Sequence, residues 1–225
     1  MIKFENVTKR FPLGNSALDR VNFEIANNEF VFLVGPSGAG KTTILKLILR
    51  EYLPTSGIIT VNDFEISKKN FQKVDILRRK IGMIFQDFKI LFDKNVYENI
   101  AISLKIIGWS ENRAHDEINR ALQLVNLPKK GDVFPAQLSA GELQRVAIAR
   151  AIIGERDTIL ADEPTGNLDP QTTWDIMKIF KKIEGKKTII FATHNTDVVN
   201  SMQKRVLSIK ESRLVKDERK GSYHL

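Results

Sequence analysis

The sequence contains no cysteine and no long apolar run among its 225 residues. The lack of cysteine excludes disulfides and thiolate metal sites, which suits a reducing compartment. No apolar run approaches the length of a membrane-spanning helix, and residues 1–5 lack the apolar core of a signal peptide. We therefore expect a protein of the cytosol that reaches a membrane only where a partner holds it.

Aromatic residues are also few, at 8%, and the surplus of positive charge is unevenly placed. Of the net charge of +8, residues 68–80 contribute +5 and residues 204–225 contribute +4. Such stretches could face nucleic acid or an anionic lipid surface. They lack a pattern of aromatic residues between the basic ones that would stack on bases. Two solvated faces are therefore the favoured interpretation.

The strongest motif is a nine-residue stretch, 35–43, that fits the phosphate-loop pattern Gly-x-x-x-x-Gly-Lys-Ser/Thr. Glycines let the backbone turn so that N–H groups point at phosphate oxygens. Lys41 would place a positive charge on the β- and γ-phosphates, and the Thr42 hydroxyl can ligate Mg²⁺. The alternative is a glycine-rich turn before an ordinary helix, but a preceding apolar strand and a following helix favour nucleotide binding. The loop consists of Gly35, Pro36, Ser37, Gly38, Ala39, Gly40, Lys41, Thr42 and Thr43.

The rest of the chain alternates predicted strands and helices. Pro12, Gly14 and Asn15 mark a turn between two strands within residues 1–25. We expect a helical insertion after residue 86, and inward-facing Trp174, Met177 and Phe180 on a later helix. Strands are predicted at 30–34, 58–61, 81–85, 158–161, 188–192, 206–209 and 213–215, and helices at 44–49, 70–79, 97–107, 110–125, 139–153 and 171–183.

Several predicted strands end in polar groups that suit nucleotide chemistry. Gly35, Gln86, the pair Asp162-Glu163, and His194 each follow a strand, so parallel strands would bring them to one edge of a sheet. Asp162 is the acid expected at the Mg²⁺ of a phosphate-loop nucleotidase. Glu163 can accept a proton from water as a general base. Phe11, before Pro12, could stack on a flat ligand, although a core aromatic at a strand end is equally consistent.

Together these motifs resemble the nucleotide-binding subunit of an ATP-binding-cassette (ABC) transporter, over essentially the whole chain. Residues 30–41 and 85–91 resemble the FtsE type of cell-division ATPase, which pairs with the membrane protein FtsX. Residues 161–169 are shared with lipoprotein-release and macrolide-export ATPases. The motifs that carry the resemblance are Gly35–Thr42, Gln86, Leu138–Glu142, Asp162-Glu163, Asn167–Asp169 and His194.

The resemblance implies one RecA-like α/β domain, 1–225, with an N-terminal antiparallel β region. Residues 1–86 and 155–225 would form its core, and about 87–154 a helical subdomain. It also implies that ATP and Mg²⁺ bind between two copies, with two ATP molecules per homodimer. In that arrangement Ser139 and Gly141 would contact the γ-phosphate from the opposite copy, and Asp169 would reach across the interface.

In such a site Glu163 would activate water, and His194 would orient the water and sense the γ-phosphate. Gln86 would join the metal site, with Thr42 and Asp162, to the surface that faces the membrane partner. Ala140 and Leu143 replace a glycine and a glutamine common in the family's signature segment, and Asn195 replaces a common aspartate. These departures remove no group with a chemical task and leave the turnover rate open.

For the FtsE type, the resemblance implies a peripheral protein on the cytoplasmic face of the bacterial membrane at the division septum. Its partners would be an FtsX-like integral membrane protein and other division proteins, and its output the control of septal peptidoglycan hydrolysis. The alternatives are a lipoprotein-release or macrolide-export ATPase, a slowly hydrolysing scaffold that recruits division proteins, and a soluble ABC ATPase acting on nucleic acid. The last is disfavoured, because the chain has no room for tandem cassettes or coiled coils, and no nucleic-acid partner is expected.

Overall fold

The computed structural model describes residues 1–12 and 16–223. These residues form two β-sheets and two groups of helices, which pack together around two hydrophobic cores. Gly14 and Asn15, where the sequence predicts a turn, lie outside the described residues. The strands are β1 (Ile2–Arg10), β2 (Ser16–Ile25), β3 (Phe30–Val34), β4 (Ser56–Val61), β5 (Phe64–Glu65), β6 (Ile81–Ile84), β7 (Thr158–Asp162), β8 (Thr188–Thr193), β9 (Arg205–Lys210) and β10 (Arg213–Glu218).

The larger sheet has the strand order β10-β9-β3-β8-β7-β6, with all neighbours parallel except β9 and β10. The smaller sheet, β2-β1-β4-β5, is antiparallel. This confirms the expected α/β cassette with an antiparallel N-terminal region. Because β3, β6, β7 and β8 are parallel neighbours, their carboxyl ends meet at one edge, where open α/β sheets bind ligands.

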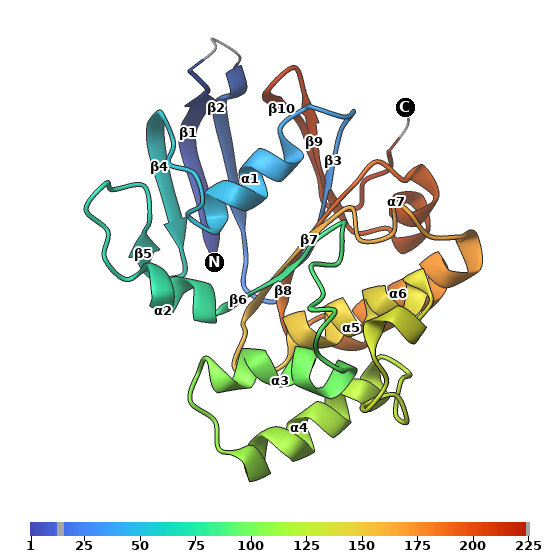
Figure 1. Ribbon diagram of the computed structural model, residues 1–225. Coiled ribbons are helices and arrows are strands. Elements are labelled where there is room, and N and C mark those ends of the chain that lie inside the picture. Colours follow the sequence, from blue (N-terminus) through green and yellow to red (C-terminus); the bar gives the residue numbers. More distant parts are fainter. Residues whose placement is uncertain (13–15, 224–225) are drawn as a thin grey trace.

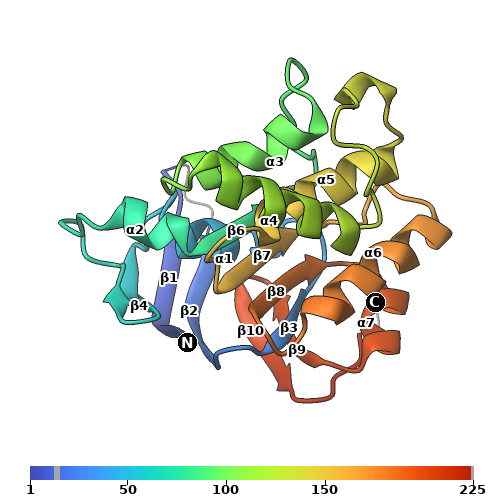
Figure 2. The same cartoon turned by 90° about the horizontal axis from the view of Figure 1, so that it is seen from below.

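The helices cover the two faces of the parallel sheet differently (Figure 1). Helix α1 lies between this sheet and the antiparallel one, whereas α3 to α7 lie on the opposite face. Figure 2 shows α3, α4 and α5 gathered beside one another, with α6 and α7 to their side. The helices are α1 (Lys41–Ile48), α2 (Val74–Arg79), α3 (Val96–Lys105), α4 (Glu111–Leu124), α5 (Ala140–Ile152), α6 (Pro170–Ile183) and α7 (Thr196–Met202), with a 3₁₀ turn, η1 (Pro135–Gln137), before α5.

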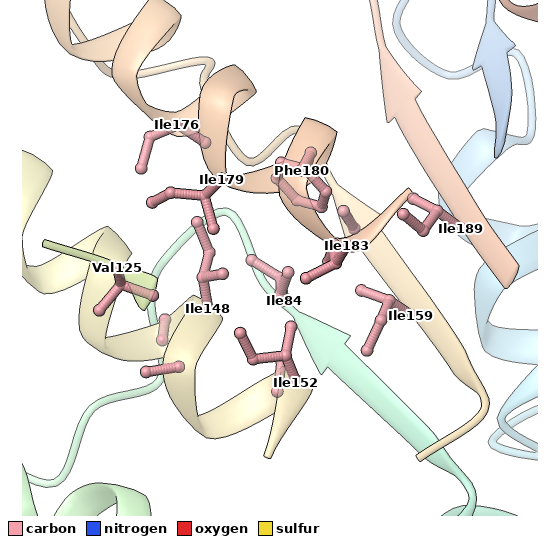
Figure 3. Close-up of a cluster of buried hydrophobic side chains, with 14 of the residues drawn as sticks. Ile84, Val125, Ile148, Ile152, Ile159, Ile176, Ile179, Phe180, Ile183 and Ile189 are labelled. Atoms are coloured by element: carbon pink, nitrogen blue, oxygen red, sulfur yellow. The ribbon is translucent and has the colours of Figure 1, made fainter. Parts of the chain in front are cut away.

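Alternate residues along each central strand enter two separate hydrophobic cores. In β3, Phe30 and Phe32 pack toward α3 to α7, whereas Val31 and Leu33 pack toward α1 and the antiparallel sheet. All five residues of β3 are buried, as expected for a strand covered on both faces. Figure 3 shows the first core, where side chains of α5, α6 and the central strands meet, among them Ile148, Ile152, Ile159, Ile176, Ile179 and Phe180.

Two local expectations need correction, and one helix was not predicted. Helix α2 begins at Val74, not Asn70, and Phe71, before it, packs against Phe64 with the ring centroids 5.8 Å apart. Trp174 is 37% exposed, so it does not face inward with Met177 and Phe180, which are buried. Helix α7 was not predicted, because it spans only seven residues.

The predicted helices of the insertion, α3, α4 and α5, are present between β6 and β7. Among the described residues, none of the helices is both long enough and apolar enough to cross a membrane.

Candidate nucleotide-binding site

The phosphate loop joins β3 to α1 and follows a path that only glycine fits at two points. Gly35 and Gly40 have φ angles of 151° and 113°, outside the range that L side chains favour. A Cβ on Gly35 would collide with the carbonyl oxygen of Ile209, and one on Gly40 would lie 2.5 Å from the carbonyl oxygen of Ala17. The spacing of glycines in the motif therefore reflects both backbone angle and close packing against β9 and β2.

Lys41 is the first residue of α1 and its side chain is 7% exposed. Its ammonium group donates hydrogen bonds to the carbonyl oxygens of Gly35, at 2.7 Å, and Pro36, at 3.2 Å. It also lies 3.5 Å from the Glu163 carboxylate. The positive charge is thus held inside the loop and directed toward the edge of the sheet.

Glu163 follows β7 in a left-handed backbone conformation, with φ of 47°. Such a conformation is unfavourable for a non-glycine residue and is found more often at functional positions. Its backbone N–H donates to the carbonyl oxygen of Ala192 on β8, which holds it there. Its carboxylate accepts from the backbone N–H of His194, at 3.3 Å, and lies 3.0 Å from His194 Nδ1. The carboxylate is therefore placed between Lys41 and His194.

Asp162 and Thr42 form a pair suited to a hydrated Mg²⁺ ion. The Thr42 hydroxyl donates to Asp162 Oδ1 at 3.1 Å. Burial raises the pKa of Asp162, and the neighbouring Glu163 charge acts in the same direction, so a bound cation would offset both effects. No cluster of three or more His, Asp or Glu that could hold a metal was found among residues 1–12 and 16–223. This donor set fits a Mg²⁺ ion that takes its other ligands from phosphates and water.

Most of the predicted nucleotide-site residues line one open cavity of about 500 Å³. Gln86, beyond β6, is among the residues that line it, and the side chain of His194, which also lines it, is 60% exposed to solvent. The residues that line the cavity are Pro36, Ser37, Gly38, Gly40, Lys41, Thr42, Thr43, Gln86, Glu163 and His194.

Ser139, Gly141 and Asp169 do not line this cavity. Ser139 caps α5 in a capping box with Glu142, and Asp169 caps α6 by accepting from the backbone N–H of Thr172 at 3.0 Å. The two helix starts touch, because a Cβ on Gly141 would collide with the Thr172 methyl group. The starts of α5 and α6 thus form a second polar patch, apart from the phosphate loop, in which Ser139 and Asp169 cap backbone N–H groups.

Phe11 also lies outside the cavity lining. Its ring meets the edge of Tyr52 with centroids 5.4 Å apart, and Lys9 Nζ lies 5.2 Å from its centre. The half-buried ring therefore packs against these two neighbours, just beyond the end of β1.

The sequence reasoning missed two polar side chains of α5 that contact segments of the site. Gln144 is buried and donates to the carbonyl oxygen of Pro164, directly after the Asp162-Glu163 pair, at 2.7 Å. Arg150 donates to the carbonyl oxygens of Phe88 and Lys89, just beyond Gln86. The signal was a polar residue on the otherwise apolar face of a helix.

A phosphate loop between strand and helix, beside an acid pair and a histidine at the same sheet edge, defines a phosphate-loop nucleotide-binding domain. A family model described as "ABC transporter" matches residues 18–166. The chain therefore belongs to the ABC transporter family.

The chain is similar along nearly its whole length to proteins named "Cell division ATP-binding protein FtsE". The Bacillus subtilis protein is 45% identical over 224 residues, covering 99% of this chain and 98% of its own. The Mycobacterium tuberculosis protein is 44% identical, with coverage of 99% and 98%. Among solved structures, the dimeric ABC transporter cassette MJ0796 superposes with a TM-score of 0.88 at 33% identity, covering 99% of this chain and all of its own. A second MJ0796 structure, also of TM-score 0.88, is described as a post-hydrolysis state bound to ADP and Pi.

Proposed function

We propose that this chain is the ATP-binding and ATP-hydrolysing subunit of an ABC-type cell-division complex of the FtsE–FtsX kind. The observation that carries the chemistry is that Glu163 lies between Lys41 and His194 in one cavity. Thr42, which also lines this cavity, donates a hydrogen bond to Asp162. The similarity to FtsE proteins supports the cellular process.

In the hydrolysis step, a water oxygen forms a bond to the γ-phosphorus of ATP. The bond from that phosphorus to the oxygen bridging the β-phosphate breaks, and the Glu163 carboxylate takes the proton of the attacking water. ADP and phosphate are the products. Lys41 stabilises negative charge on the β- and γ-phosphates, and His194 holds the carboxylate of Glu163 in place and contacts the γ-phosphate.

Thr42, Asp162 and Gln86 are the residues that would hold Mg²⁺. When bound, the ion supplies positive charge that stabilises the phosphate oxygens during transfer. The raised pKa of Asp162 fits this role, because a carboxylate that costs free energy when charged in a buried site gains most from a cation beside it.

We further propose that the active form is a homodimer with ATP at the interface. In each half, Ser139 and Gly141 of one copy reach the γ-phosphate on the phosphate loop of the other, and Asp169 contacts that interface. Their position apart from their own loop supports this arrangement. Residues 87–154 would form the helical subdomain that carries this patch, and the remainder the catalytic core.

A membrane partner of the FtsX type would dock near the segment that follows Gln86 in the chain. Phe92, shortly after Gln86 in the chain, is a large apolar side chain that is 63% exposed, and such side chains are typical of contact surfaces. The protein would then work on the cytoplasmic face of the membrane at the division septum, with Mg-ATP as its cofactor and control of septal peptidoglycan hydrolysis as its output.

The test is a membrane pull-down with the Glu163→Gln variant in Mg-ATP, followed by identification of the proteins that co-purify. An FtsX-like membrane protein supports the proposal, and its loss from a Lys41→Ala bait shows that capture depends on ATP binding. An exporter or lipoprotein-release permease would contradict the cell-division assignment while leaving the ATPase chemistry intact. Measured turnover of the wild-type complex would separate an ATPase from a nucleotide-gated scaffold.

A further inference from the structure

The chain leaves β6 through a strained segment. After Gln86, residues Phe88 and Lys89 both have left-handed φ angles, 58° and 50°. Neither is glycine, so each adopts an unfavourable backbone conformation that surrounding contacts must offset. Besides contacts within the segment, such as the ion pair of Lys89 with Asp87, a device from a distant helix holds this backbone.

Arg150, in the last turn of α5, is that device. Its guanidinium donates one hydrogen bond to the carbonyl oxygen of Phe88, at 2.9 Å, and another to that of Lys89, at 2.7 Å. The planar fork of an arginine can hold two successive carbonyl groups at once, which the single ammonium of a lysine does less well. One side chain therefore fixes both strained residues.

The backbone of Arg150 is itself fixed from two directions. Its carbonyl oxygen accepts from Ser103 of α3, at 3.2 Å, and from Arg156, at 2.7 Å. Burial lowers the pKa of Arg150, and within the part of the chain that the structure describes no carboxylate forms an ion pair with it. The carbonyl groups of residues 88 and 89 are thus the principal partners of a half-buried cation.

We propose that Arg150 is a positioning residue for ATP hydrolysis, which sets the place of Gln86 by holding residues 88 and 89 in their left-handed conformation. Arg150 thereby links Gln86, which lines the catalytic cavity, to the last turn of α5. Ser139 caps the opposite end of the same helix. A change in the tilt of α5 would move the carbonyl-binding guanidinium and, through it, Gln86. The inference rests on the proposed role of Gln86 at the metal site.

The first experiment compares Arg150→Gln with Arg78→Gln in steady-state ATP hydrolysis by the full chain. Arg78 is a matched control, because its guanidinium also donates to two successive carbonyl oxygens, those of Leu49 and Arg50, which lie outside residues 86–89. We expect Arg150→Gln to lower kcat about tenfold or more, with less than a twofold change in KM for ATP, as displacement of a positioning group does. Equal losses of kcat in the two variants would overturn the inference.

A double-mutant cycle with Gln86→Ala tests the route of the effect. If Arg150 acts through Gln86, Arg150→Gln should cause little further loss of kcat once Gln86 is absent. Independent effects, which multiply in the double variant, would overturn the inference and leave the role of Gln86 intact. Full kcat in Gln86→Ala alone would instead overturn the proposed role of Gln86 and the inference together.

Should Arg150→Gln not fold, Arg150→Lys keeps the charge and the aliphatic stem but loses the fork. We expect it to lower kcat in the same way, and we expect Lys89→Gly to restore part of the loss, because glycine adopts a positive φ without a clamp. Wild-type kcat in Arg150→Lys, or no recovery on adding Lys89→Gly, would contradict the claim that the fork acts by holding this backbone.

Discussion

Lys41 illustrates how, at the residue scale, one buried charge serves both structure and chemistry. Its ammonium is held by the carbonyl oxygens of the loop that it belongs to, so the unfavourable burial of a cation is offset before any phosphate arrives. This arrangement also keeps the side chain extended toward Glu163.

The first prediction concerns that charge. Lys41→Ala should weaken ATP binding about 10- to 100-fold, because charge-assisted hydrogen bonds to the phosphates are lost. A fluorescence titration with a labelled nucleotide measures the change, and Lys46→Ala, on the same helix but outside the cavity lining, is the control. An undiminished affinity in Lys41→Ala would contradict the placement of the phosphates.

The second prediction follows from the raised pKa of Asp162. The fold favours the protonated form, so the contribution of Asp162 to stability is greatest at low pH and falls as pH rises through its raised pKa. Asp162→Asn keeps an oxygen for Thr42 but carries no charge. It should therefore raise Tm by about 1–3 °C at neutral pH without Mg-ATP and abolish Mg-dependent hydrolysis. Thermal unfolding across a pH series measures this, and a lower Tm at neutral pH would contradict it.

At the scale of elements, the starts of α5 and α6 depend on each other. Gly141 allows α5 to approach Thr172 of α6 closely, while Ser139 and Asp169 cap the two helices. The capping box of Ser139 could be recognised from sequence, because it depends on Ser139 and Glu142, which lie three positions apart. The contact between the two helix starts could not.

The third prediction tests that contact. Gly141→Ala should lower the free energy of unfolding by about 1–2 kcal/mol through overpacking, although the helix propensity of alanine acts in the opposite direction. Adding Thr172→Ser removes the colliding methyl group and should restore most of the loss. Gly131→Ala is the matched control, since its Cβ would lie 3.8 Å from its neighbours. Urea denaturation measures all of these variants, and equal stability of Gly141→Ala and wild type would refute the close approach.

For the whole molecule, the separation of the two patches is the main constraint. The phosphate loop, Glu163 and His194 face one cavity, whereas Ser139, Gly141 and Asp169 lie outside it. A single copy therefore contributes its two patches to two different ATP sites of the proposed dimer, and two-fold symmetry lets one interface with a second copy complete both sites.

The fourth prediction is a change of assembly state. Glu163→Gln should lower kcat by about 100-fold or more and accumulate an ATP-bound dimer, because the amide keeps the shape of the carboxylate but cannot take the proton. Light scattering with and without Mg-ATP measures the mass. Glu155→Gln, at an exposed position outside the cavity lining, should behave as wild type. A Glu163→Gln protein that stays monomeric with ATP would sink the proposed dimer.

The charge distribution of the whole molecule is also less uneven than the sequence implies. Arg205 pairs with Glu29 and Asp217, and Arg213 pairs with Asp19. The acidic partners Asp19 and Glu29 lie outside the stretch 204–225. These ion pairs across the fold therefore neutralise part of the positive charge that is concentrated in that stretch of the sequence.

The sequence alone determined the features that depend on neighbouring residues. Short patterns of glycine, β-branched and polar residues predict the phosphate loop, the buried strands 30–34 and 188–192, and the cap at Ser139. The order of strand-end groups was also readable, because parallel strands bring their carboxyl ends together whatever the intervening loops do.

Only the tertiary structure decided which distant groups touch. The hydrogen bond from Thr42 to Asp162 joins residues 120 positions apart, and Arg150 reaches residues 61 and 62 positions before it. Tertiary packing also differs from what the local sequence pattern predicts at two places. Helix α2 begins later than predicted, and the side chain of Trp174 is exposed. Contacts of this kind depend on how two cores pack against the faces of one sheet, and no window of neighbouring residues contains that information.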